Sequence, residues 1–364
     1  MRIGVLTYHR AHNYGAMLQA YALLSFLRNH GYHAELIDYW PITHRNQYAL
    51  IKPIVGTNFI YKVKNTIADI CTFWRRYRRI QGFQMFENSY LNLPTEIKYT
   101  NANAVIDTNY DCVIAGSDQI WRNRDSNNNH IGFDPVYFCQ HIPKNIRCIS
   151  YAASMGIIQL NKEDKDILKN YLNRFSRILV RENSLKEAID ELGFDSAIVV
   201  DPTLLLSKDE WNKFLPNKRF HTTKYVLYYE LVKSKEALVF AKYKAEELGC
   251  KLLIMDATIP LIPQRRHISY ASPIEFLHAI RDAEFVIATS FHGTAFSVIF
   301  EKQFITIGLK KNADRVQTML HQLDIEEHYQ EHPQNVMDID YAQVKIRFSK
   351  LVANSMHLLL TSIL

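Results

Sequence analysis

The chain has 364 residues, of which 48% are hydrophobic and 22% charged, and its formal net charge is +6. This length favours two globular domains over one, and the composition is that of an ordinary globular protein. No apolar run reaches the length of a bilayer span, and the first residues lack the apolar core of a signal peptide. The five cysteines are scattered without C-x-x-C spacing, which argues against a disulfide framework or a thiolate metal site. We therefore expect a cytoplasmic protein without a metal.

The first 39 residues predict a βαβ unit, in which a helix ended by Gly31 joins two strands. The loop before the helix contains Asn13, Tyr14 and Gly15, which are candidate binding residues at the edge of the sheet. The loop lacks the three spaced glycines of a dinucleotide fingerprint. The alternative is that Asn13 only turns the chain.

A basic segment then interrupts the α/β alternation. Between residues 41 and 81 it holds eight lysines and arginines, four of them at Arg75, Arg76, Arg78 and Arg79, against the single acid Asp69. Aromatic residues are interleaved with these charges. A mostly helical segment of this kind suits an anionic membrane surface or a polyanion, and the alternative is a solvated helix lying over the domain.

The α/β pattern resumes with a strand over residues 110–115, which leads into Ser117, Asp118 and Gln119. Asp118 is a candidate base or ligand for sugar hydroxyls, and the alternative is that it caps the following turn. A further strand over residues 147–156 ends in small residues.

The strand over residues 177–180 ends at Arg181, at the start of the next predicted helix. A positive charge at a helix N-terminus is repelled by the helix dipole, so another interaction must stabilise the arginine there. One such interaction would be with an anion bound in the cleft. The alternative is a structural ion pair with Glu182, Glu187 or Asp201.

The second half repeats the pattern after a polar linker at residues 207–224. We expect an N-terminal domain over residues 1–206 with a basic insert at about 41–95, a C-terminal domain over residues 225–338, and a helix at 339–364 that packs back across both. The two halves predict two Rossmann-like domains that face a shared cleft.

The stretch 284–300 predicts a strand, a tight polar turn and a helix, the unit whose turn lies at the ligand-binding edge of a parallel sheet. His292 lies in that turn, where a helix N-terminus attracts phosphate or carboxylate. Histidine is the side chain most easily poised to exchange a proton near neutral pH. The alternative is that His292 caps the helix or packs beneath a loop. Lys310, Lys311 and Arg315 follow the next strand and could converge on the same anion.

These motifs in this order resemble the polysaccharide pyruvyl transferase family. The resemblance covers nearly the whole chain outside the basic segment and residues 255–270, and it rests on the following stretches: Asn13-Tyr14-Gly15-Ala16, Ala115-Gly116-Ser117-Asp118-Gln119-Ile120-Trp121, Ser150-Tyr151-Ala152-Ala153-Ser154, Val180-Arg181-Glu182, Asp201-Pro202-Thr203 and Ser290-Phe291-His292-Gly293-Thr294.

The resemblance implies a fold of glycosyltransferase B type and transfer of an enolpyruvyl-derived group from phosphoenolpyruvate to a sugar, as a pyruvate ketal. It implies a glycan or lipid-linked saccharide as acceptor, and no metal, nucleotide or nucleic acid. His292 matches the family's general acid, with Asp118 as a second catalytic candidate. The implied donor-binding residues are Arg181, Ser290, Phe291, Gly293, Thr294, Lys310, Lys311 and Arg315. The implied acceptor-binding residues are Asn13, Tyr14, Gly15, Ser117 and Gln119.

One departure from the family pattern is Ser290, where many members carry an arginine, so Arg315, Lys310 or Lys311 would take over its contact with the donor. Lipid-linked acceptors would give the basic segment a role in peripheral contact with the inner membrane surface.

One alternative function is a glycosyltransferase of the same fold that uses a nucleotide sugar. It would need an acid for the ribose, and the candidates Glu275 and Glu301 do not follow a strand. A non-catalytic polyanion-binding protein is a further alternative, supported by the basic segment alone.

Overall fold

The computed structural model describes residues 1–41, 48, 50, 59–93, 99–100, 109–124, 132–261, 266–308 and 313–364, with only the backbone described over 59–67. Lys310 and Lys311 lie outside the described residues. So does most of the basic segment before residue 59.

The N-terminal sheet is parallel, with the strand order β2-β1-β3-β4. Single parallel bridges from Ile149 to Arg177 and from Ala153 to Val180 continue it into the β5–β6 pair. Almost every residue of β1, β3 and β4 is buried and apolar, as expected for strands covered on both faces. The elements of this half are β1 (Arg2–Leu6), α1 (Tyr14–Asn29), β2 (His33–Leu36), β3 (Cys112–Ala115), η2 (Pro135–Phe138), β4 (Arg147–Ser150), α4 (Lys162–Leu172), β5 (Ile178–Val180), α5 (Asn183–Glu191), β6 (Ser196–Ile198) and η3 (Pro202–Leu205).

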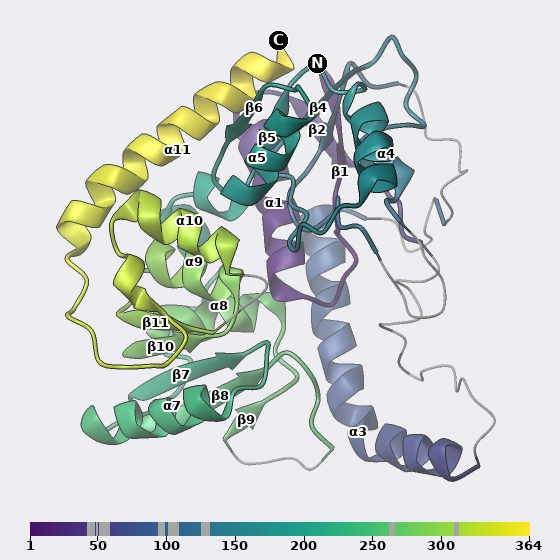
Figure 1. The fold of residues 1–364 in the computed structure, drawn as a ribbon. Helices are drawn as coiled ribbons and strands as arrows, with labels where there is room; N and C mark the ends of the chain where they lie inside the picture. The colour runs from purple at the N-terminus through teal and green to yellow at the C-terminus, as the bar shows by residue number, and fades with distance from the viewer. Residues whose placement is uncertain are drawn as a thin grey trace.

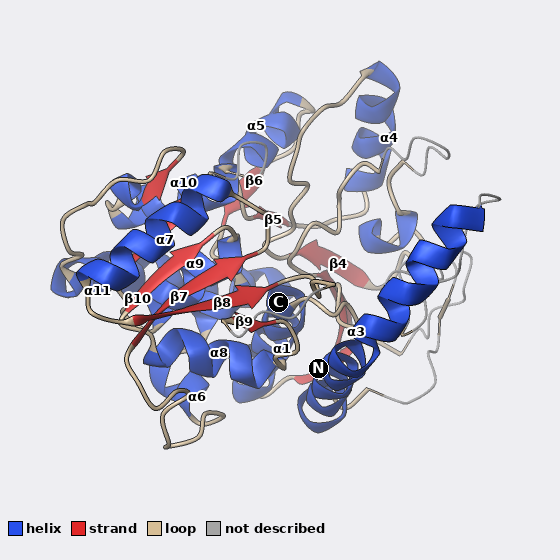
Figure 2. Ribbon diagram, turned by 90° about the horizontal axis from the view of Figure 1, so that it is seen from below, coloured by secondary structure: helices blue, strands red, loops and turns tan. Residues whose placement is uncertain are grey.

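The C-terminal sheet is also parallel, with the order β12-β11-β10-β7-β8-β9. Figure 2 labels its strands β10, β7, β8 and β9. Alternate residues of β7 face opposite layers, since Val226 packs with α7 and Leu227 packs with α8. The elements are α6 (Lys208–Asn212), β7 (Tyr225–Glu230), α7 (Lys235–Glu247), β8 (Lys251–Asp256), β9 (His267–Ile268), α8 (Pro273–Asp282), β10 (Phe285–Ala288), α9 (Phe291–Ile299), β11 (Phe304–Ile307), α10 (Asp314–Leu323), η5 (Glu326–His328), β12 (Tyr329–Gln330) and α11 (Tyr341–Ile363).

The two predicted Rossmann-like halves are therefore confirmed, each with parallel strands and covering helices (Figure 1). The C-terminal helix α11 packs back onto the N-terminal half, where Ser355 Oγ accepts the N–H of Val200 at 3.0 Å. The segment expected as a polar linker contains α6, whose Trp211 is fully buried. Among the described residues, no helix is long and apolar enough to cross a membrane.

The domain contact beside the cleft is a stack of aromatic rings. Tyr14, in the first turn of α1, is fully buried between Phe83 at 5.4 Å and Phe276 at 4.6 Å, measured between ring centroids. Its hydroxyl donates to the carbonyl of Ala271 in the C-terminal half, at 3.1 Å. Tyr14 therefore fixes the start of α1 against the other domain and does not face the cleft.

The helix α3 (Phe59–Phe86) continues into a π-helical turn, η1 (Glu87–Leu91), and lies along both domains (Figure 1). Its Arg79 is buried and donates to the carbonyls of Asp256 and Ser269 at 3.2 and 3.3 Å, and to that of His12 at 3.3 Å. Arg79 therefore ties α3 both to the C-terminal sheet and to the loop that precedes α1.

Candidate active site

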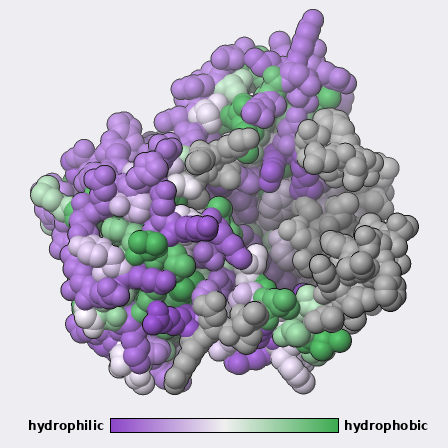
Figure 3. All heavy atoms as spheres, turned by 60° about the horizontal axis from the view of Figure 1, so that its bottom comes forward, coloured by the Kyte–Doolittle hydropathy of each residue, from purple (hydrophilic) through white to green (hydrophobic). Residues whose placement is uncertain are grey.

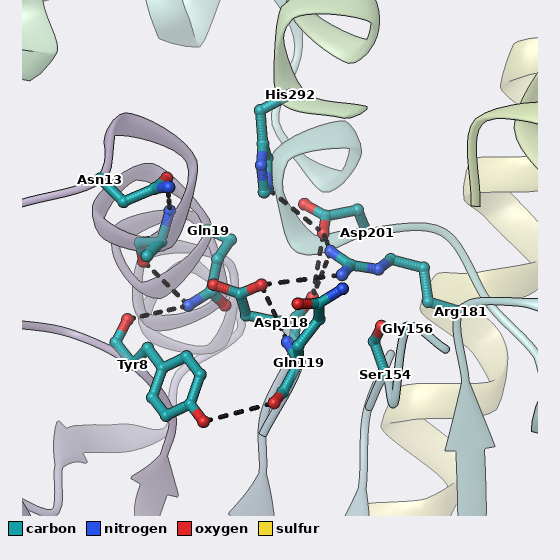
Figure 4. A network of polar contacts seen from close by, with 12 residues as sticks. Tyr8, Asn13, Gln19, Asp118, Gln119, Ser154, Gly156, Arg181, Asp201 and His292 are labelled. Atoms are coloured by element: carbon teal, nitrogen blue, oxygen red, sulfur yellow. Dashed lines mark hydrogen bonds and ion pairs between the residues drawn. The ribbon is translucent and has the colours of Figure 1, made fainter. Parts of the chain in front are cut away.

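Arg181 and Asp201 form a buried ion pair at the carboxyl edge of the N-terminal sheet (Figure 4). Arg181 follows β5 and is 3% exposed, while Asp201 lies after β6 and is 1% exposed. Nη1 of Arg181 donates to Oδ2 of Asp201 and, at 3.2 Å, to the hydroxyl of Ser117. The carboxylate explains why an arginine is tolerated at the start of α5, so the structural pairing that the sequence left open is made with Asp201.

The other two nitrogens of Arg181, Nε and Nη2, have no hydrogen-bond partner among the described residues. Nη2 lies 3.9 Å from Oδ1 of Asp118, and Nε lies 4.0 Å from Oε2 of Glu182, both beyond hydrogen-bond length. The guanidinium is 4.8 Å from the centroid of the Phe291 ring. A buried N–H without a partner costs about 1–3 kcal/mol, so this edge of Arg181 is suited to an anionic ligand.

His292 extends from the first turn of α9 toward the N-terminal domain (Figure 4). Its Nε2 lies 3.7 Å from Oδ2 of Asp201 and has no hydrogen-bond partner among the described residues. The ring rests on Gly15 of α1, where an added Cβ would lie only 1.9 Å from Nδ1 of His292. Gly15 is therefore needed for the close approach of the imidazole and not for a turn.

The charge of Asp201 acts on both of these neighbours. Burial alone would raise the pKa of Asp201, but the charge of Arg181 and the contact with His292 outweigh burial and hold this pKa well below its ordinary value. At 3.7 Å the contact is longer than a hydrogen bond, and catalytic contacts of this kind commonly tighten when substrate binds.

Asp118 lies at the end of β3 with a left-handed backbone, at φ 75°, which is uncommon outside glycine. A bridge to Ala153 and a hydrogen bond from Ser154 N to the Asp118 carbonyl, at 3.1 Å, hold this conformation. Oδ1 of Asp118 accepts the N–H of the next residue, Gln119, at 2.8 Å. The side chain is still 18% exposed and lies beside Arg181, where it can also meet a ligand.

Arg315 lies in the first turn of α10 and adds a second guanidinium near Arg181. Burial, and then the positive charge of Arg181, lower the pKa of Arg315 to about 10. Its Nε has no hydrogen-bond partner among the described residues. The neighbouring Asp314 accepts the N–H of Ser184 at 3.1 Å, so α10 is joined to the start of α5.

Two residues of this site, Glu182 and Asp201, appeared in the sequence analysis as possible partners of Arg181 and within the matching stretches, but not among the expected binding or catalytic residues. Oε1 of the fully buried Glu182 accepts the Ser154 hydroxyl at 2.8 Å and the N–H groups of Met155 and Gly156 at 2.9 and 3.1 Å. Glu182 thereby holds the loop after β4. The signal available in the sequence was the counter-charge that a buried arginine requires.

The residues around His292 that were expected to bind the donor make contacts within α9 and its neighbours. The Ser290 hydroxyl caps α9 by accepting the N–H of Gly293 at 2.9 Å. An added Cβ on Gly293 would lie 2.9 Å from Ala288, so its role is close packing. Thr294 is fully buried and its hydroxyl is 2.6 Å from that of Thr306.

The expected acceptor-side residues also divide between the site and its support. Asn13 caps α1 by accepting the N–H of Ala16 at 3.3 Å. The fully buried Ser117 donates to Oδ2 of Asp201 at 2.9 Å and so belongs to the Arg181 network. The carbonyl of Gln119 accepts the hydroxyl of Tyr8 at 3.3 Å.

A cavity of about 380 Å³ lies between the domains on the α3 side of Asn13. Its walls include His12 and Asn13 of the N-terminal domain, Arg79 of α3, Tyr229 near the end of β7 and Thr258 after β8. This volume lies in the range of ligand pockets. Burial, and then the charge of Arg79, lower the pKa of His12 to about 4, so this histidine is neutral at physiological pH.

The two acids considered for a nucleotide ribose are engaged in other contacts. Oε2 of Glu275 accepts the N–H of Ser272 at 2.7 Å in the capping box of α8. Glu301 pairs with Lys208 at 3.3 Å and with Lys345 at 3.2 Å. Neither acid is placed to hold a ribose.

Comparisons with solved structures give likenesses at low identity. The chain aligns over 100% of its length with 99% of a UDP-GlcNAc 2-epimerase from Neisseria meningitidis bound to UDP-GlcNAc, at 10% identity and a TM-score of 0.46. It aligns over 98% of its length with 96% of a glycosyltransferase from Streptomyces sp. SF2575 complexed with thymidine diphosphate, at 10% identity and a TM-score of 0.42. The architecture itself follows from the two parallel sheets of this chain.

No curated protein sequence matches the chain. A family model described as polysaccharide pyruvyl transferase matches residues 13–311. The match begins at the cap of α1, contains Arg181, Asp201 and His292, and extends past β11. The chain belongs to the polysaccharide pyruvyl transferase family.

Proposed function

We propose that the protein transfers the enolpyruvyl-derived group of phosphoenolpyruvate to a sugar of a polysaccharide or of its lipid-linked precursor, and leaves pyruvate as a ketal on two hydroxyls. The observation that carries the proposal is the convergence of Arg181 and His292 on the buried carboxylate of Asp201. Both residues keep nitrogens without hydrogen-bond partners among the described residues. An anionic donor that must be protonated fits this pair of groups.

The reaction needs one acid and one base. His292 would deliver a proton to the methylene carbon of phosphoenolpyruvate, which becomes a methyl group, while positive charge develops on the neighbouring carbon. A sugar hydroxyl attacks that carbon and loses its proton to Asp118. The carbon–oxygen bond to phosphate then breaks, and Asp118 passes its new proton to the departing phosphate. A second hydroxyl attacks the same carbon, closes the ketal and gives its proton back to His292. A positioned acid of this kind typically contributes about 10²–10⁴-fold.

The charges of the described residues set a requirement for donor binding. By formal charge, Arg181 and Arg315 contribute two positive charges and Asp118, Glu182 and Asp201 contribute three negative charges, so these five side chains sum to one net negative charge. A donor with several negative charges needs further cations, and the sequence supplies Lys310 and Lys311 three and four residues beyond the end of β11.

The acceptor would enter from the side of the cavity beside Asn13. The cavity reaches the loop that begins α1, and His292 lies on Gly15 of that helix. A sugar there could present hydroxyls toward His292 and Asp118.

Calorimetric titration with phosphoenolpyruvate tests the donor assignment. Arg315→Met is the preferred variant, because Arg315 forms no ion pair with a carboxylate among the described residues. Loss of one charged hydrogen bond should weaken phosphoenolpyruvate binding about 10–100-fold. The matched control is Arg174→Met, since the acceptors of this partly buried arginine in the described part of the chain are all carbonyls, including those of Pro143 and Ile146 at 2.8 Å. The control should bind phosphoenolpyruvate as the parent does.

Measuring the stability of the protein with each ligand distinguishes this proposal from a glycosyltransferase that uses a nucleotide sugar. Phosphoenolpyruvate at 100 times its dissociation constant should stabilise the parent by about 2.7 kcal/mol, whereas UDP-sugars should have no effect. Stabilisation by a UDP-sugar without stabilisation by phosphoenolpyruvate would overturn the proposal.

A further inference from the structure

One face of α3 exposes four large hydrophobic side chains: Ile70 at 70%, Trp74 at 73%, Tyr77 at 39% and Met85 at 67%. We call these four residues the α3 stripe. Single exposed hydrophobic residues are normal, and the face of the molecule in Figure 3 is largely hydrophilic with separate hydrophobic patches. The α3 stripe differs because its members share one helix at helical spacing.

The α3 stripe lies opposite the face that packs on the protein. At 3.6 residues per turn its members fall within about 80° of one another. The buried residues Thr72, Arg79, Phe83 and Phe86 fall on the other side of the helix. The core therefore accounts for one face of α3 and leaves the α3 stripe to solvent. The rings of Phe73 and Tyr77 stack at 6.4 Å between centroids, which supports the aromatic part of this surface.

The charge on α3 is positive and poorly compensated. Arg75 donates to the carbonyl of Pro260 at 2.6 Å, and Arg78 lies 4.4 Å from the centroid of the Tyr270 ring. Arg79 is buried on the packed face and does not belong to this surface. The carbonyl and the ring hold Arg75 and Arg78 in place without cancelling their charge. Among the described residues, the arginines of α3 form one ion pair, between Arg76 and Asp69 at 2.8 Å.

We infer that the α3 stripe is the surface by which the protein binds lipid bilayers that contain anionic lipids. Tryptophan and tyrosine favour the headgroup level of a bilayer, and basic residues beside them are attracted to anionic lipids. A protein partner would need acidic groups to match the positive charge of α3, whereas a bilayer supplies both anionic headgroups and an apolar interior. This surface is separate from Arg181 and His292, so its failure would leave the proposed transfer reaction standing.

Trp74 provides a built-in probe for this inference. The chain has four tryptophans, and the other three, Trp40, Trp121 and Trp211, are buried. Titration with phosphatidylcholine vesicles containing 30% phosphatidylglycerol should shift the tryptophan emission to shorter wavelength and allow quenching by brominated lipids. Pure phosphatidylcholine vesicles should give a smaller shift, and raising the salt from 50 to 500 mM should weaken binding.

Ile70→Ser/Tyr77→Ser keeps the probe and removes two members of the α3 stripe. Sedimentation with the anionic vesicles should show at least a tenfold loss of partitioning. The matched control is Val239→Ser/Tyr243→Ser, which changes two exposed residues of α7, at 66% and 49% exposure, and should partition as the parent does. Replacing the arginines is a poorer test, since it also removes contacts that hold α3.

Three results would overturn the inference. The first is an emission spectrum that does not respond to anionic vesicles. The second is equal loss of partitioning in the α7 control. The third is a pair of observations made without lipid: Trp74 already emits at shorter wavelength, and light scattering shows a dimer that Ile70→Ser/Tyr77→Ser dissociates. The α3 stripe would then bind a second copy of the chain.

Discussion

Gly15→Ala tests whether the contact between the two domains positions His292. The new Cβ would lie 1.9 Å from Nδ1, 2.2 Å from Cγ and 2.4 Å from Cε1 of the imidazole. Ordinary contacts between such atoms are about 3.5 Å, so the ring must move by roughly 1.5 Å. A misplacement of about 1 Å in a catalytic arrangement can cost 10²-fold. We therefore expect pyruvyl transfer to fall at least about 100-fold.

The effect on stability should be much smaller. Overpacking costs about 1–3 kcal/mol, and alanine is favoured over glycine within a helix by about 0.5–1 kcal/mol. The net loss is then about 0–2.5 kcal/mol, which leaves the protein folded at 25 °C. Phosphoenolpyruvate binding should change less than the rate, because Arg181 and Arg315 are untouched.

Phosphate release with a panel of lipid-linked or model β-galactosides gives the rate, and thermal unfolding gives the stability. The matched control is Gly82→Ala, whose Cβ would lie 2.8 Å from Cβ of Ser272 and far from the imidazole. It should lose similar stability and keep its rate within about twofold. A Gly15→Ala enzyme within threefold of the parent rate would refute the reasoning.

Two buried acids give further predictions. Asp201→Asn should destabilise the fold by about 3–5 kcal/mol in chemical denaturation, because Arg181 loses its counter-charge. The pKa of Asp201 is depressed in the folded state. The carboxylate therefore adds to the free energy of unfolding above the unfolded pKa near 4, and this stabilisation is lost as the pH falls below that value. A difference in unfolding free energy between parent and variant that stays constant from pH 6 to pH 3 would contradict this. For Glu87, burial outweighs the attraction of Arg10 and raises the pKa to about 7. The folded state then holds a proton that the unfolded state releases, so the unfolding free energy of the parent should fall as the pH rises from about 5 to 7. Glu87→Gln should remove this dependence on pH. Equal dependence in parent and variant would show that Glu87 ionises normally.

The sequence predicted where the candidate site residues lie relative to the strands better than it predicted their contacts. Apolar strands followed by polar residues placed Asp118, Arg181 and His292 at strand ends, and parallel strands bring such ends to one edge of a sheet. Spacing along one chain does not reveal which groups meet across two domains. The contact of Gly15 with His292 joins residues far apart in the sequence and depends on the docking of α1 against α9.

Residue type alone also could not distinguish residues that bind a ligand from residues that stabilise the structure around the site. Ser290, Thr294 and Ser117 carry hydroxyls at the expected edge, but caps and buried networks use these hydroxyls. Charge counting along the basic segment likewise predicted a cationic surface, whereas Arg79 is buried and holds α3 against main-chain carbonyls. The periodicity of exposed residues in α3 became apparent only when its packed face was known.

The central claim is that His292 protonates phosphoenolpyruvate bound beside Arg181. Its most direct test is the reaction in D₂O, with the ketal methyl group read by NMR and mass spectrometry. The parent enzyme should place one solvent deuterium in each product methyl group, while His292→Gln should bind phosphoenolpyruvate within threefold of the parent and form no product. Formation of deuterated ketal by His292→Gln at the parent rate would contradict the claim.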